Sequence, residues 1–158
     1  MDQSDDTSTF SPNEARTLAA LLDEVIPPSG DGRLPGAGEL GIGGYIEEAL
    51  QGAPLSRAVL AEGLALIGEL ANQRNPGGFA ALSSPEGLEL LNEVTSRQPG
   101  FLPNVIFHTY AGYYRNGRVM EALGLEPRPP HPKGYEVEPD DLTLLEQVRQ
   151  RPKLYREV

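Results

Sequence analysis

The chain has 158 residues, no cysteine and a formal net charge of −10, from 13 lysines and arginines against 23 aspartates and glutamates. This length suits one domain with a sizeable core, and the lack of cysteine excludes disulfides, thiol catalysis and cysteine-ligated metal centres. The negative charge disfavours nucleic acid and anionic membranes as partners, and no apolar stretch approaches the roughly 20 residues of a membrane span.

A first helix is predicted to start after Ser11, which is followed by a proline and, three residues on, by Glu14. This combines a capping box with proline at the first helical position. Leucines then recur at spacings of three and four until Pro27 and Pro28 end the pattern. Residues 1–9, which are acidic, are expected to form a disordered tail.

Three more helices are predicted in the middle of the chain. A glycine-rich passage runs to about Gly38 and leads into a helix over residues 39–50, which its glycines weaken. The clearest amphipathic pattern covers residues 55–72. A fourth helix is expected from Ser84, with an apolar face made of Leu88, Leu91 and Val94.

The segment from Phe101 to Tyr135 is the most distinctive part of the sequence, because it holds four of the six tyrosines. A helix through its first half is apolar around most of its circumference and leaves a narrow polar stripe of Asn104, His108 and Arg115. We therefore expect this helix to be largely buried or covered by a partner. Tyrosine fits a core and an interface equally well, so both interpretations stay open.

The remaining sequence predicts a short helix over residues 118–123, a proline-rich passage over residues 126–138 and a last helix after Pro139. No alternating strand pattern and no internal repeat is found. The expected fold class is therefore all-α, a compact bundle of about five to six helices with proline- and glycine-rich connections. Residues 10–158 are predicted to form a single helical domain.

Motifs for chemistry are few. The glycines at positions 36, 38 and 41 match G-x-G-x-x-G, but no strand leads into them, so we interpret them as a tight turn. His108 and His131 lack an acidic residue at the spacing of helical metal sites. A catalytic role for His108 is the weaker hypothesis, because no nucleophile or substrate is evident. The glutamates resemble solvated helix faces rather than an acid–base pair.

Three groups of motifs in order resemble the gluconate 2-dehydrogenase subunit 3 family, the small subunits of membrane-associated flavin-dependent sugar and alcohol dehydrogenases. The first is a leucine-rich helix between an aromatic start and an Ile-Pro turn: Phe10-Ser11-Pro12 and Val25-Ile26-Pro27. The second is Pro35-Gly36-Ala37 with Leu40-Gly41-Ile42 and Tyr45-Ile46. The third is Thr109-Tyr110-Ala111-Gly112-Tyr113-Tyr114, followed by Ala122-Leu123-Gly124-Leu125 and Pro132-Lys133-Gly134-Tyr135.

The resemblance implies a non-catalytic accessory subunit that binds a large flavin-dependent dehydrogenase subunit of the glucose–methanol–choline type and helps it mature or reach its site. FAD is then expected on that partner, with no cofactor on this chain, and a cytochrome c subunit is a further candidate partner. Adding His108 of the polar stripe to the family motif positions gives the predicted partner-binding set: Gly36, Ala37, His108, Tyr110, Gly112, Tyr113, Tyr114, Gly134 and Tyr135.

Two other classes of function stay open from the sequence. One is a free-standing all-α binding module or chaperone with an aromatic-lined pocket, and the other is an enzyme with an unrecognised site. Members of the resembled family commonly start with a twin-arginine leader, whereas this sequence starts with acidic residues. The expected location is therefore the cytoplasm by default, and the periplasm if a leader was removed or the partner carries one.

Overall fold

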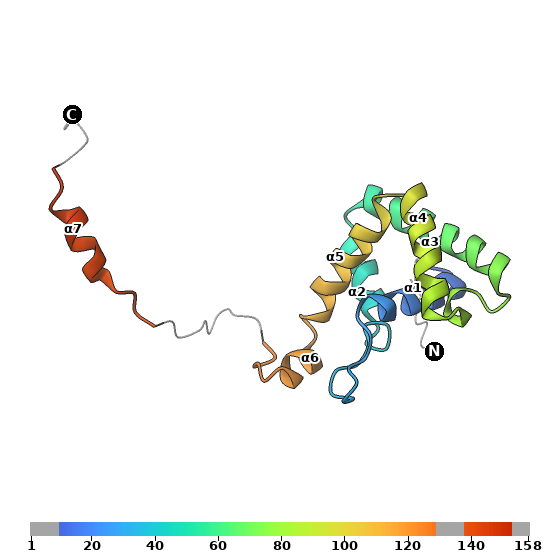
Figure 1. Ribbon diagram of the computed structural model, residues 1–158, viewed down its shortest axis with the longest axis horizontal. Coiled ribbons are helices and arrows are strands. Elements are labelled where there is room, and N and C mark those ends of the chain that lie inside the picture. The colour runs from blue at the N-terminus through green and yellow to red at the C-terminus, as the bar shows by residue number, and fades with distance from the viewer. Residues whose placement is uncertain (1–9, 129–137, 153–158) are drawn as a thin grey trace, which may run out of the picture. The chain divides into compact units, whose positions relative to one another are not determined.

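The computed structural model describes residues 10–128 and 138–152, which fall into two units divided between Pro127 and Arg128 (Figure 1). All regular structure in these two ranges is helical, which confirms the all-α prediction. The first unit contains these elements: α1 (Pro12–Val25), α2 (Ile42–Leu50), α3 (Pro54–Arg74), the 3₁₀ turn η1 (Phe79–Ala81), α4 (Ser84–Arg97), α5 (Phe101–Tyr113) and α6 (Gly117–Ala122).

Capping boxes start two of these helices. At α1 the Ser11 hydroxyl accepts the Glu14 N–H at 3.3 Å, and the Ser11 N–H donates to the Glu14 carboxylate at 2.9 Å. At α4 the cap is Ser83, whose N–H donates to the Glu86 carboxylate at 2.9 Å. Such caps satisfy N–H groups that the helix leaves open, and each contributes about 1 kcal/mol.

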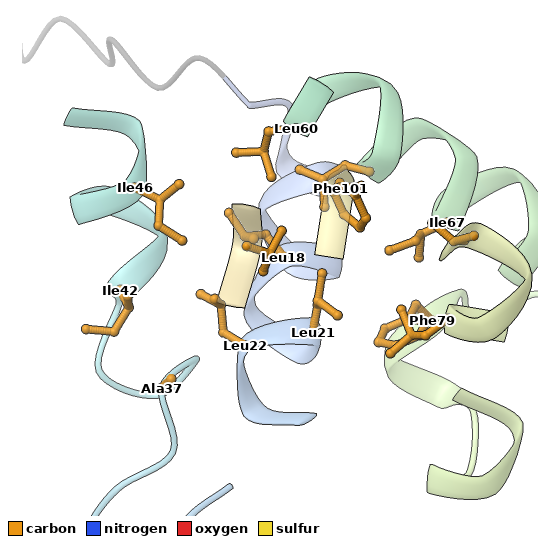
Figure 2. Close-up of a cluster of buried hydrophobic side chains, with 14 of the residues drawn as sticks. Leu18, Leu21, Leu22, Ala37, Ile42, Ile46, Leu60, Ile67, Phe79 and Phe101 are labelled. Carbon is orange, nitrogen blue, oxygen red and sulfur yellow. The ribbon is translucent and has the colours of Figure 1, made fainter. Parts of the chain in front are cut away.

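The core of the first unit forms around α1. Figure 2 shows its apolar side chains between those of α2 on one side and those of α3 and η1 on the other. The residues concerned are Leu18, Leu21 and Leu22 of α1, Ile42 and Ile46 of α2, Ile67 of α3 and Phe79 of η1. All are 5% exposed or less, so these elements form one continuous core.

Close approach of α3 and α5 depends on a glycine. Gly63 of α3 faces the Phe101 ring, and a Cβ at that glycine would overlap the ring atoms. Phe101 is fully buried as a result. Phe101 occupies the space that a larger residue at position 63 would need, so α5 begins deep in the core.

Two sequence expectations about helix faces and bounds were wrong in detail. Leu88 of α4 is 55% exposed, and the buried face consists instead of Gly87, Leu90, Leu91 and Val94. A spacing of three drifts around a helix of 3.6 residues per turn, so Leu88 leaves the face that Gly87, Leu91 and Val94 share. The helix α2 starts at Ile42, later than expected, because Gly41 takes a left-handed φ of 68° before it.

The second unit contains a 3₁₀ turn, η2 (Leu142–Leu145), followed by one helical turn, α7 (Glu146–Arg149). Asp141 caps the start, where its carboxylate accepts the Thr143 N–H at 3.1 Å. The predicted last helix is thus present in a shorter and partly 3₁₀ form. Its described apolar side chains are 44–59% exposed: Leu142, Leu145 and Val148.

Candidate interaction surface

Helix α5 buries one face in the core of the first unit and exposes the other. It packs against α1, α2 and α3. Its buried residues are Phe101, Val105, Thr109, Gly112 and Tyr113. Thr109, the polar member of this face, satisfies its hydroxyl by donating to the Val105 carbonyl oxygen at 2.7 Å.

The outer face of α5 carries three aromatic rings, which we call the aromatic crest: Phe107, Tyr110 and Tyr114. They lie at spacings of three and four and are 68%, 46% and 52% exposed. The Tyr110 and Tyr114 rings stack with centroids 6.0 Å apart and an interplanar angle of 13°. Contiguous exposed aromatic surface of this kind marks contact sites for other proteins.

Tyr113, directly before Tyr114, lies inside the unit at 2% exposure. Its hydroxyl donates to the Pro35 carbonyl oxygen at 2.9 Å, which ties α5 to the loop between α1 and α2. Burial raises the pKa of the Tyr113 phenol above its usual range, and the neighbouring Tyr114 adds to the shift. Tyr113 therefore holds the fold and presents no surface to a partner.

Gly112 also serves packing within the unit. A Cβ on this glycine would overlap the Tyr45 ring and would lie 2.9 Å from the Ile42 Cγ2, both on α2. Only glycine lets α2 and α5 approach this closely. The Gly-Tyr-Tyr motif thus combines a helix contact (Gly112), a buried anchor (Tyr113) and an exposed ring (Tyr114).

The Pro-Gly-Ala motif holds its loop against α1. Gly36 and Ala37 are buried, and a Cβ on Gly36 would overlap the Asp23 carboxylate. The same carboxylate accepts the Gly38 N–H at 2.8 Å, while the Ala37 N–H donates to the Ile26 carbonyl oxygen at 3.0 Å. These contacts bury both motif positions inside the unit.

Of the predicted polar stripe, Asn104 and His108 lie on α5, and Arg115 follows its end and contacts α2. Arg115 extends over the Tyr45 ring, with its guanidinium carbon 5.3 Å from the ring centroid. Asn104 and His108, one turn apart, each keep a buried polar atom without a hydrogen-bond partner, Oδ1 and Nδ1 respectively. The His108 and Phe107 rings lie edge to face, with their centroids 5.2 Å apart. His108 thus borders the crest, although its Nδ1 is covered.

A groove of about 280 Å³ runs beside the crest between α1, α4 and α5. Its floor includes the buried Leu21 and Leu91, and its rim includes Leu88, Ile106 and the crest residue Tyr110. The remaining lining residues are Glu24, Val25, Asn92 and Leu102. This apolar groove and the crest form one continuous surface, since Tyr110 belongs to both.

Glu24 is the one charged side chain among the described residues that line the groove. Arg74, at the end of α3, and Arg97 of α4 both contact Glu93 of α4, at 3.0 Å in the case of Arg74, so these two cations are already paired. Glu24 of α1 accepts a hydrogen bond from the Ser84 hydroxyl at 3.0 Å. Because this donor is neutral, it leaves the negative charge of Glu24 uncompensated. The groove therefore presents a negative charge at one edge.

The described residues supply no grouping for a metal site, since nowhere in 10–128 or 138–152 do three His, Asp or Glu side chains gather suitably. Among the same residues, no helix is both long and apolar enough to cross a membrane. Two members of the predicted partner-binding set, Gly134 and Tyr135, lie outside the described residues.

Sequence reasoning missed two parts of this surface. Phe107, the most exposed ring of the crest, is absent from the predicted partner-binding set, and the groove with Leu88 and Ile106 was not foreseen. The position of Leu88 in the sequence was the signal for the groove. At 3.6 residues per turn, Leu88 lies off the face that Gly87 shares with the buried residues of α4.

Taken together, the fold and this surface define a small all-helical protein with an exposed aromatic crest beside an apolar groove. The family model described as gluconate 2-dehydrogenase subunit 3 matches residues 12–123, from the start of α1 to the residue after α6, and the chain belongs to this family. By its name the family is a dehydrogenase subunit, which agrees with an accessory role in a dehydrogenase complex. No curated protein and no solved structure matches the chain.

Proposed function

We propose that this chain is the non-catalytic accessory subunit of a flavin-dependent dehydrogenase and that its aromatic crest binds the large subunit. The partner is an enzyme of the glucose–methanol–choline type that carries FAD and acts on a sugar or an alcohol. The small subunit stabilises this enzyme or helps it mature. A cytochrome c subunit is a further candidate member of the complex.

The observation that carries the proposal is the exposed crest on a helix of a chain that belongs to a dehydrogenase subunit family. Rigid aromatic side chains contribute much of the binding energy at protein interfaces, because they bury a large area at little entropic cost. Burial of a half-exposed ring by a partner stabilises a complex by about 1 kcal/mol or more. Three adjacent rings can therefore anchor a stable contact.

The placement of the crest favours an accessory subunit over a free-standing binding module. A small-ligand site surrounds most of its ligand with concave walls. Phe107 and Tyr114 are more than half exposed on the outer face of α5, and of the crest only Tyr110 lines the groove. Such rings suit the broad surface of another protein.

We assign the flavin to the partner because the glycine motif of this chain has a structural use. The loop around Gly36 and Gly38 packs on α1 through Asp23, and no strand occurs in the described residues to form a dinucleotide-binding unit. Hydride transfer by a flavin enzyme then falls to the large subunit.

Affinity purification of the tagged chain from its native cells at native expression tests the proposal. We expect a stoichiometric larger polypeptide and a flavin absorption band in the eluate, together with substrate-dependent dye reduction. A variant with Phe107→Ala and Tyr114→Ala should lose the flavoprotein but keep its helical circular dichroism. Its control is Leu55→Ala, an apolar residue of α3 that is 83% exposed. A colourless single chain from the wild type would refute the proposal.

A further inference from the structure

The groove beside the crest has apolar side chains on its rim. Leu88 and Ile106 stand on opposite walls, on α4 and α5, and remain 55% and 40% exposed. The floor below them is filled by Leu21 and Leu91, which are 0% and 7% exposed. Water therefore meets apolar side chains along both walls, and a partner that covered them would release it.

The size and chemistry of the groove suit protein side chains better than a cofactor. Its volume of about 280 Å³ lies below the roughly 300–1,000 Å³ that is typical of small-molecule sites. Polar groups at its edge are limited to Glu24, Asn92 and the Tyr110 hydroxyl. A flavin or nucleotide needs more convergent polar contacts than these, whereas one or two apolar side chains need none.

Charge decides which kind of segment fits. Glu24 is the charged side chain that lines the groove, and its hydrogen bond comes from the Ser84 hydroxyl rather than from a cation. The chain as a whole carries a net charge of −10. A basic residue beside an apolar anchor would complement both features, and complementary charge favours the correct partner and its rate of encounter.

We infer that the groove receives an amphipathic segment of the large dehydrogenase subunit, with an apolar side chain between Leu88 and Ile106 and a lysine or arginine paired with Glu24. The inference rests on the proposed function and specifies how that partner is recognised. Because Tyr110 belongs to both the crest and the groove, one partner covers both without a break. Apolar helices bind grooves between helices in this way.

The first experiment measures the affinity of the full-length chain for the isolated flavoprotein subunit. Leu88→Asp places a charge on the groove wall and should weaken binding on the order of tenfold. Its matched control is Leu55→Asp on α3, an exposed leucine outside the groove, which should bind as the wild type does. Both changed residues are exposed, so circular dichroism should report an unchanged fold.

Two charge-reversal variants, one in the groove and one away from it, test the role of Glu24. Glu24→Lys should weaken binding several-fold and reduce its dependence on salt, because the complementary pair is replaced by repulsion. Glu62→Lys, at an exposed position of α3, makes the same change in net charge away from the groove and should have little effect. Equal effects of the two variants would overturn the assignment of a basic segment to Glu24.

Photocrosslinking identifies the occupant directly. Benzoylphenylalanine in place of Asn92, at the groove edge, should crosslink to a peptide of the flavoprotein that contains apolar residues and a lysine or arginine. A crosslink to a second copy of this chain, or none in a complex that still forms, would overturn the inference while the proposed function stands. If the wild-type chain forms no complex with a flavoprotein, the proposed function itself fails.

Discussion

The two adjacent tyrosines Tyr113 and Tyr114 should respond in opposite ways to substitution. Tyr113 is 2% exposed, so Tyr113→Ala removes a buried ring, a change that costs about 3–5 kcal/mol in protein cores. Tyr113→Phe keeps the ring but leaves the Pro35 carbonyl oxygen without its donor, which costs about 1–2 kcal/mol. Tyr114→Ala removes a ring that is 52% exposed and stacks on Tyr110, so we expect at most about 1 kcal/mol.

Thermal unfolding followed by circular dichroism at 222 nm measures these differences, supported by urea unfolding at 25 °C. For a unit of this size about 1 kcal/mol corresponds to roughly 3–5 °C in Tm, so Tyr113→Ala should be clearly separated from the other two variants. Affinity for the flavoprotein should show the reverse order, with Tyr114→Ala weakened and Tyr113→Phe nearly unchanged. Equal losses of stability for Tyr113→Ala and Tyr114→Ala would refute the assignment of Tyr113 to the core.

Three further results are expected. Gly38→Ala should destabilise the protein by about 1–3 kcal/mol because its Cβ would overlap the Ala19 carbonyl oxygen, whereas Gly30→Ala, with open space around it, should be neutral in urea unfolding. Burial raises the pKa of Tyr113 in the folded state. The contribution of the neutral Tyr113 phenol to stability should therefore be fully present below the unfolded tyrosine pKa of about 10 and should be lost as pH rises above it. Tyr113→Phe should show a smaller fall between pH 8 and pH 11, and an equal fall would contradict this reasoning. Residues 1–127 alone should keep the wild-type Tm, because the described core ends at Val119, and a large loss would show that the core extends further.

The motifs that revealed the family have different physical duties. The Pro-Gly-Ala loop and Gly112 hold elements together at distances where a side chain would clash, and Tyr113 anchors α5 to that loop. His108, Tyr110 and Tyr114 lie on or beside the exposed crest. A family motif therefore marked the segment that bears the crest, but it did not separate residues that hold the fold from residues that face outward.

Local signals in the sequence determined the helices. Capping boxes at Ser11 and Ser83, proline stops and glycine turns act within a few residues of the chain, so they can be read without knowledge of the fold. The same locality explains the errors. At the start of α2 the glycine loop packs against α1, and on α4 Gly87 packs against Phe79 of η1, so both errors fall where an element meets a neighbour outside itself.

The sequence by itself thus determined the fold class, the family and the helix that bears the candidate site. Only the tertiary structure decided which tyrosines are buried, because α5 is apolar around most of its circumference and offers no contrast between its faces. Consecutive residues on a helix point about 100° apart, so Tyr113 turns toward Pro35 and the core while Tyr114 turns outward. That choice depends on where α1, α2 and α3 lie, and those positions are set by long-range packing rather than by the local pattern.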